Sequence, residues 1–237
     1  MSDLSLQLQQ SRGQLPVSSY FDEALYAQEI EKLFKSGPRY VGHALSVPEI
    51  GDYHALAHEQ EGRALVRTAQ GIQLISNVCR HRQAVMLKGR GNLHDPDKNM
   101  GGNLVCPLHR WTYAPNGDLL GAPHFQQDPC LNLQNYPLQE WNGMLFEVNG
   151  RDVATDLGSL GPRAALDFTG YSLSHIEQHV CHYNWKTFIE VYLEDYHVGP
   201  FHPGLGNFVT CDDLQWELRS EEHTSELQSR QYLVCRL

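Results

Sequence analysis

The first regular pattern of apolar positions along the chain is helical and follows a polar leader. Asp22 can cap a helix that continues to about Lys35, and Gly37-Pro38 then ends it. The apolar stripe of this helix consists of Leu25, Ile30, Leu33 and Phe34. We therefore predict a leader and one helix, over residues 22–35, within the segment 1–39.

Between residues 40 and 150 the pattern changes to short runs that are typical of β-strands. The runs 64–68 and 72–76 flank Ala69-Gln70-Gly71, which predicts a hairpin. Two further runs, 111–113 and 144–148, precede the turn sequences Pro115-Asn116-Gly117-Asp118 and Asn149-Gly150. These features predict one small antiparallel β domain over residues 40–150.

Residues 151–170 are richer in Gly, Pro and Asp, and we interpret them as a connection to a second domain. This domain begins with a strand-like segment over residues 171–182. A helical pattern then runs from Asn184 to His197. We expect the second domain to occupy residues 171–218.

Composition and charge exclude several classes of protein. The chain is 41% hydrophobic and 19% charged, as in globular proteins, and its net charge of −10 argues against binding to nucleic acid. No apolar run reaches the roughly 18–20 residues that a membrane-spanning helix needs. The segment Met1 to Gln14 lacks the pattern of a secretory signal. We therefore expect a cytoplasmic protein that binds neither nucleic acid nor membranes.

Two short motifs combine cysteine with histidine. Cys79-Arg80-His81 and Cys106-Pro107-Leu108-His109 each place a thiolate and an imidazole a few residues apart, between predicted strands. In a reducing compartment such clusters indicate metal ligands. Thiolates suit one iron of a cluster, and imidazoles suit a second, more exposed iron. The motifs predict a Rieske [2Fe–2S] site, in which two neutral histidines raise the reduction potential into the range of roughly −150 to +300 mV.

Two other interpretations of these four residues remain open. The same ligand types could bind a single zinc ion, or the four residues could be gathered by chance. Zinc sites prefer Cys-x-x-Cys pairs, or cysteine and histidine pairs on separate elements. A mixed pair on each of two loops is therefore unusual for zinc.

A second group of metal-binding residue types lies near the end of the second helical pattern. Glu190, Glu194 and His197 are spaced i, i+4 and i+7, so on one continuous helix they would fall within about 60° of one another. His202 follows in a proline-containing loop. Two histidines beside carboxylates suit a mononuclear ferrous site with open positions for dioxygen. The alternative is a solvated acidic helix whose histidines are nearby without function.

Together these motifs resemble the large subunits of Rieske non-haem iron oxygenases, the ring-hydroxylating family. The resemblance extends from about residue 20 to 215. It rests on four segments: the helix at 22–35, the strand Tyr40-Val41-Gly42-His43, the first loop Asn77–Arg82, and the second loop Cys106–Tyr113 with Asn116-Gly117.

Two features depart from the usual pattern of that family. The gap between His81 and Cys106 is 24 residues, which is longer than usual, and residues 93–100 are the expected insert. Leu108 and Arg110 replace the tyrosine and glycine that are common at these positions. Neither departure removes a ligand, so both concern the surroundings of the cluster and the docking of partners.

The resemblance implies a fold and a set of residue roles. The fold would be a mostly β Rieske domain followed by an α+β, helix-grip-like catalytic domain. Cys79, His81, Cys106 and His109 would bind the 2Fe-2S Rieske cluster, and His197 and His202 would bind the mononuclear Fe(II). Glu194 would be the catalytic carboxylate that links this iron to a Rieske histidine, usually on a neighbouring subunit, and Asp195 is the less favoured candidate.

The resemblance also implies an activity and partners. The chain would belong to a terminal oxygenase that receives electrons from NAD(P)H through a separate reductase or ferredoxin. With dioxygen it would hydroxylate, dihydroxylate or demethylate a small organic substrate, as in aromatic hydrocarbon catabolism, and the intact parent would be a homotrimer. Two other classes remain: a non-catalytic Rieske electron-transfer protein and a zinc-stabilised binding module.

The remaining cysteines and several histidines carry no ligand pattern. Cys130, Cys181 and Cys211 lack histidines at ligand spacing, and we predict that they pack in the interior. We expect four histidines to be structural or exposed: His124, His175, His179 and His182.

The end of the chain differs in character from the rest. Residues 219–229 resemble translated sequencing-adapter DNA, and 233–237 resemble a further adapter segment. We interpret residues 219–237 as such an artefact and exclude them from the fold; the alternative is a native amphipathic tail. On this interpretation the catalytic domain is truncated after residue 218, its third iron ligand is absent, and the chain as given is inactive.

Overall fold

The computed structural model describes residues 15–59, 62–98, 100–158, 163–193 and 197–205, together with strands at 216–219 and 228–231. The chain divides into two compact units. The β unit contains Ala24–Gln178, and the second unit contains Met1–Glu23 and His179–Leu237. Residues 15–23, the first that the structure describes, therefore belong to the same unit as the residues after 178, a connection that the sequence pattern did not indicate.

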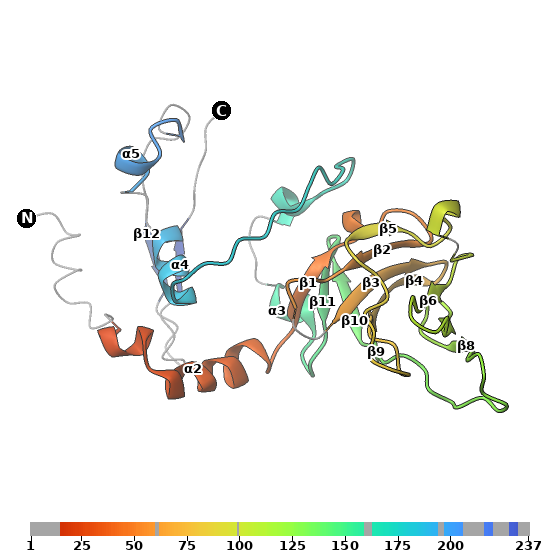
Figure 1. The fold of residues 1–237 in the computed structure, drawn as a ribbon. Helices are drawn as coiled ribbons and strands as arrows, with labels where there is room; N and C mark the ends of the chain where they lie inside the picture. Colours follow the sequence, from red (N-terminus) through yellow and green to blue (C-terminus); the bar gives the residue numbers. More distant parts are fainter. Residues whose placement is uncertain are drawn as a thin grey trace, which may run out of the picture. The chain divides into compact units, whose positions relative to one another are not determined.

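Two antiparallel sheets form the frame of the β unit (Figure 1). The larger sheet has the strand order β5-β2-β3-β4-β9, and the smaller has the order β1-β11-β10. Their strands are β1 (Arg39–His43), β2 (Asp52–Ala55), β3 (Arg63–Thr68), β4 (Gly71–Ser76), β5 (Arg90–Asn92), β9 (Asn135–Tyr136), β10 (Leu138–Trp141) and β11 (Met144–Glu147). The predicted antiparallel β domain is confirmed.

A third, smaller sheet has the order β6-β7-β8. Its strands are β6 (Leu104–Val105), β7 (Thr112–Tyr113) and β8 (Leu119–Gly121). The residues between β6 and β7 contain the second predicted ligand loop, so the two ends of that loop are joined by strand pairing.

The predicted hairpin is present, and its strands are one residue longer than expected. Strands β3 and β4 pair from Arg63 opposite Ser76 to Thr68 opposite Gly71. The turn consists of Ala69 and Gln70, and the Thr68 hydroxyl accepts a hydrogen bond from the Gln70 N–H over 3.1 Å. Gly71, which the sequence placed in the turn, is the first residue of β4.

The core of the β unit lies on both faces of the larger sheet. Successive side chains of a strand point to opposite faces, and the first four of β3, residues 63–66, are buried on both. Ala64 and Val66 pack in the cluster that also contains Cys79 and Cys106. Leu65 packs on the other face, in the cluster that includes residues of the smaller sheet. The sheet therefore supports the ligand loops on one side.

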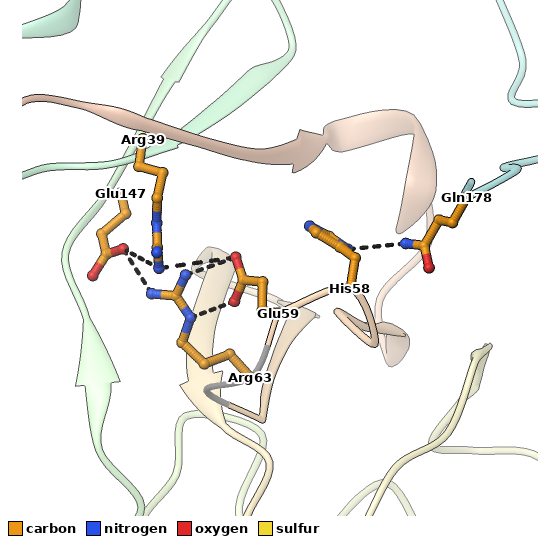
Figure 2. Close-up of polar contacts among 6 residues, drawn as sticks. All are labelled: Arg39, His58, Glu59, Arg63, Glu147 and Gln178. Atoms are coloured by element: carbon orange, nitrogen blue, oxygen red, sulfur yellow. Dashed lines mark hydrogen bonds and ion pairs between the residues drawn. The ribbon is translucent and has the colours of Figure 1, made fainter. Parts of the chain in front are cut away.

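The buried guanidinium of Arg63 lies at the centre of a four-charge network (Figure 2). Arg63 is 1% exposed and donates to both carboxylate oxygens of Glu59, over 2.6 and 2.7 Å, and to Glu147 over 2.7 Å. Arg39 also contacts Glu147, over 3.1 Å. Burial alone would lower the pKa of Arg63, but hydrogen bonds and charge from the two glutamates outweigh it and raise the pKa. The network is balanced in charge and joins β1, β3 and β11 to the loop before β3.

Helices are short in the described part of the chain. The predicted helix over 22–35 is confirmed as α2 (Glu23–Glu29), which continues as a π-helical segment, Ile30–Phe34. The remaining α-helices are α3 (Val153–Asp156), α4 (Trp185–Tyr192) and α5 (Val198–Phe201), and the 3-10 helices are Val17–Tyr20, Ala44–Ser46, Pro96–Lys98 and Arg163–Leu166. Within the described ranges, no helix has the length and apolar character needed to cross a membrane.

Two predictions for the second half of the chain need correction. Residues 171–182 contain no strand, although their composition favours one, because no described strand lies beside them to complete the hydrogen bonding. The helix predicted from Asn184 to His197 begins as expected, with the Asn184 side chain accepting from the Lys186 N–H, but α4 ends at Tyr192. Val191 and Tyr192 are exposed, so packing contributes little to extending the helix.

The last described residues form an antiparallel pair. Strand β12 (Trp216–Arg219) pairs with β13 (Gln228–Gln231) from Trp216 opposite Gln231 to Arg219 opposite Gln228. Strand β12 thus crosses the boundary predicted at residue 218. The origin of residues 219–237 stays a prediction.

The Arg63 network predicts a large effect on stability. We expect Arg63→Ala to lower the free energy of unfolding by about 3–5 kcal/mol, because it leaves two largely buried carboxylates without their partner. Lys35→Ala is the control, since the Lys35–Glu31 pair is exposed and contributes at most about 0.5 kcal/mol. Urea unfolding followed by tryptophan fluorescence measures both. Equal losses in the two variants would contradict the structural role of the network.

Candidate functional site

The two predicted ligand loops have the same backbone hydrogen bonds. In the first loop the Cys79 N–H donates to the Ala84 carbonyl over 2.9 Å, and the Gln83 N–H donates to the Cys79 carbonyl over 3.0 Å. In the second loop the Cys106 N–H donates to Trp111 over 2.8 Å, and the Arg110 N–H donates to Cys106 over 3.0 Å. Each cysteine therefore begins a closed loop of six residues.

One residue in each loop adopts a left-handed backbone conformation. Gln83 has φ of 57° and Arg110 has φ of 63°, and each lies four residues after its cysteine. This conformation costs roughly 1–2 kcal/mol for a residue other than glycine. It explains why glycine is suited to the position that Arg110 occupies, and it shows that the arginine keeps the shape of the loop.

The two cysteine side chains meet in the interior of the β unit. Cys79 and Cys106 are 1% and 2% exposed. Burial raises the pKa of the Cys106 thiol, and the neighbouring Cys79 raises it further, while the N–H groups of Leu108 and His109 act in the opposite direction. The Tyr113 hydroxyl accepts from the Arg80 N–H over 3.1 Å and lies 3.4 Å from Cys79 Sγ. Its own proton is therefore free to be donated to that sulfur.

The two histidines lie beside each other at the outer end of the loops. The ring centroids of His81 and His109 are 4.7 Å apart, with an angle of 70° between the planes. His81 stacks on the buried ring of Trp111 at 5.0 Å, and Phe125 contacts Trp111 edge-on at 5.1 Å. The four residues thus form a set with thiols inside and imidazoles outside.

This set fits a [2Fe–2S] cluster. Nδ1 of His81 is buried and has no hydrogen-bond partner within the described ranges, a condition that normally has an explanation such as a missing ligand. Burial, with smaller effects from His109 and Arg82, lowers the pKa of His81 and favours the neutral imidazole that binds metals.

The geometry also bears on the zinc alternative. A structural zinc ion needs four ligands that converge on one point. In the part of the chain that the structure describes, no three or more His, Cys, Asp or Glu side chains converge in this way. A Rieske cluster needs two protein ligands for each iron, since sulfide supplies the others. The same four side chains would serve either group, so the choice between them rests on the ligand spacing and on the comparisons below.

The structure describes only part of the predicted mononuclear site, and the assignment of its ligands stays a prediction. His197 and His202 flank α5, and their ring centroids are 5.3 Å apart. Glu194 and Asp195 lie outside the described residues. Because α4 ends at Tyr192, the argument that placed Glu190 and His197 on one face of a single helix is wrong. Glu190 instead accepts a hydrogen bond from the Tyr20 hydroxyl.

Several other predictions can be compared with the structure. Cys130 and Cys181 are exposed, so the prediction that they pack in the interior is wrong, and Cys211 lies outside the described residues. Both exposed cysteines occur in segments without regular structure, where the apolar character of a cysteine does not ensure burial. The four histidines expected to be structural or exposed are exposed: His124, His175, His179 and His182.

The β unit also contains a cavity of about 760 Å³ that the sequence did not indicate. His43, Arg67 and Phe168 are among its lining residues. The lining includes no predicted metal ligand, so this cavity is distinct from the paired loops.

Comparisons with known proteins assign the segment that contains the paired loops to a known family. Residues 38–137 match the Rieske [2Fe-2S] domain, and residues 170–233 match the catalytic domain of the ring hydroxylating alpha subunit. Putrescine 2-hydroxylase of Ralstonia nicotianae is 65% identical over 219 residues, covering 92% of this chain and 58% of that protein. The carnitine monooxygenase oxygenase subunit of Escherichia coli is 28% identical, over 84% of this chain and 54% of that protein. The chain thus spans little more than half the length of these relatives.

Solved structures show the same fold. A quaternary ammonium Rieske monooxygenase crystallised with an inhibitor superimposes with a TM-score of 0.69 at 22% identity, covering 94% of this chain and 62% of that one. Naphthalene 1,2-dioxygenase from Rhodococcus gives 0.67 at 24% identity, covering 84% and 48%. The expected link to aromatic hydrocarbon catabolism is not supported, because two relatives at 65% and 58% identity are named for putrescine.

The contact between Tyr113 and Cys79 predicts an effect on reduction potential. A hydrogen bond to sulfur stabilises the more negative, reduced state, so we expect Tyr113→Phe to lower the potential of the protein by roughly 40 mV, about 1 kcal/mol for one electron. Tyr53→Phe is the control, because Tyr53 is a buried tyrosine of the same core whose hydroxyl is bonded to Lys98. A redox titration that gives the same potential for both variants would show that the hydroxyl does not act on the sulfur.

Proposed function

We propose that the chain, which belongs to the alpha subunits of the Rieske oxygenases, forms part of a terminal oxygenase that hydroxylates a small organic substrate. The observation that carries this proposal is the matched pair of loops, which brings two buried thiols and two adjacent imidazoles together. When bound, a [2Fe–2S] cluster and a ferrous ion would supply electron storage and the activation of dioxygen.

The roles that we propose for the chain's own residues follow their positions. Cys79 and Cys106 would hold the inner iron, and His81 and His109 the outer one. Tyr113 would donate its proton to the Cys79 sulfur, and the stacked ring of Trp111 would fix the plane of His81.

The roles in the second unit rest on fewer contacts. His197 and His202, one helical turn apart, would provide two ligands to the ferrous ion. Glu194 would hydrogen-bond a ligand histidine and so connect this iron with a Rieske histidine of a neighbouring subunit in a homotrimer.

We propose a short aliphatic diamine as the substrate class. The support is the 65% identity to a putrescine 2-hydroxylase over almost the whole chain. Because the chain spans 58% of that relative, the substrate, the homotrimer, the separate NAD(P)H-dependent reductase or ferredoxin and the cytoplasmic location are all parts of the proposal.

Hydroxylation of putrescine is the direct test. We expect the product of the complete reading frame, with a competent reductase, to give a hydroxylated diamine by mass spectrometry, and to leave salicylate and biphenyl unchanged. His197→Ala and His202→Ala should each lower turnover by at least about 100-fold while keeping the cluster, because a ferrous site with one histidine fewer binds its metal weakly.

The same samples separate the proposal from its alternative. Iron content above two per chain in the unsubstituted protein, falling to two in the His197 variant, supports the second metal site. Two irons per chain in both proteins, with reversible reduction and no product from any substrate, would instead identify a non-catalytic electron-transfer protein.

A further inference from the structure

The two ligand loops differ in how their ends are held together. The second loop is closed by the paired strands β6 and β7, with Val105 opposite Thr112. The first loop has only an isolated bridge between Val78 and Val85. Both loops have the same pair of hydrogen bonds at their cysteine, so these bonds do not explain how the ends of the first loop are joined.

Asn77 provides the interaction that joins these ends. Its side-chain Oδ1 accepts from the Leu87 N–H over 2.7 Å, and its Nδ2 donates to the Leu87 carbonyl over 2.8 Å. Its backbone carbonyl accepts from the Met86 N–H over 3.0 Å. Asn77 is 2% exposed, so these bonds are shielded from water. One residue thus joins both ends of the first loop.

The remaining backbone group of Asn77 connects the loop to the rest of the β unit. Its N–H donates to the Gly62 carbonyl over 2.8 Å. Gly62 has φ of +61°, and a Cβ there would lie 2.8 Å from Cγ2 of Val78. The next residue is Arg63, which the carboxylates of Glu59 and Glu147 hold in place (Figure 2). The loop is therefore anchored, through Asn77 and Gly62, to the buried charge network.

We propose that Asn77 is a positioning residue that sets Cys79 and His81 against Cys106 and His109. The proposal rests on the proposed function, because it assumes that these four residues bind the cluster. The asparagine amide offers a donor and an acceptor side by side, so one side chain satisfies both backbone groups of Leu87. A leucine at residue 77, which is similar in size and cannot form hydrogen bonds, would leave both backbone groups of Leu87 without a partner and open the base of the loop.

Opening the base of the first loop would move the nearby cluster ligands. Cys79 is two residues from Asn77, and its sulfur already lies at 3.4 Å from the Tyr113 hydroxyl. A small movement of the loop would change this contact and the stacking of His81 on Trp111. The effect of Asn77 should therefore appear in the spectrum and potential of the cluster as well as in stability.

The experiment compares two perturbations of the anchor with a matched control. Asn77→Leu removes both side-chain hydrogen bonds to Leu87, and Gly62→Ala pushes on Val78 without changing Asn77. Gly101→Ala is the control, because Gly101 has nearly the same φ of +58° but no atom within 4 Å of its Cβ position. We expect the first two variants to change the electron paramagnetic resonance (EPR) spectrum of the reduced protein. Both should also lose iron to a chelator about tenfold faster, because the first leaves buried backbone groups of Leu87 without partners and the second displaces Val78, next to Cys79. Gly101→Ala should match the unsubstituted chain in both measurements.

The outcomes distinguish a failure of cluster binding from a failure of the positioning role of Asn77. If the unsubstituted chain binds no cluster, the proposed function fails. If it binds one and both anchor variants keep the unsubstituted spectrum, potential and rate of iron loss, the positioning role of Asn77 is wrong. If Asn77→Leu does not fold, as judged by circular dichroism, Gly62→Ala decides by the same criteria. Equal effects of Gly62→Ala and Gly101→Ala would also contradict the proposal.

Discussion

Two loops that lie apart in the sequence must present four ligands at fixed positions. Each loop is closed by hydrogen bonds that involve the backbone N–H and the carbonyl of its cysteine. The amide and carbonyl of Cys79 are bonded within its loop, and those of Cys106 are bonded in the same way. Both thiols are then buried against the larger sheet, while the imidazoles remain at the outer end. A cluster held in this way would have an insulated inner iron and an accessible outer one, which suits the transfer of single electrons.

The sheet that supports the loops contains a charge network where apolar packing would be the usual choice. Replacing buried ion pairs by apolar residues is often neutral or stabilising, so such a network gives weak evidence of stability gained. Its position is more informative. Arg63 follows the glycine that accepts a hydrogen bond from Asn77, so the network lies next to the base of the first loop. Directional charge contacts fix position in a way that interchangeable apolar contacts do not.

The parts of the structure that the sequence predicted correctly are those with local signals. The β3–β4 hairpin follows from two short strand-like runs around a short turn, and the start of α4 follows from Asn184. The four cluster residues could be proposed from two short motifs alone. The strand expected over 171–182 and the burial of Cys130 and Cys181 were wrong, because strand pairing and burial depend on partners distant in sequence. The role of Asn77 could not be predicted for the same reason, since its partners at Gly62 and Leu87 become neighbours only in the folded sheet.

The central claim is that two histidines and two cysteines of these loops hold one [2Fe–2S] cluster. Electron nuclear double resonance on the reduced, anaerobically assembled protein tests it directly, because it detects the nitrogen nuclei bound to iron. The account predicts coupling to two histidine nitrogens in a protein with two irons and two sulfides per chain, and coupling to one in His81→Ala or His109→Ala if the cluster survives. A cluster without nitrogen coupling, or stoichiometric zinc without sulfide, would contradict it.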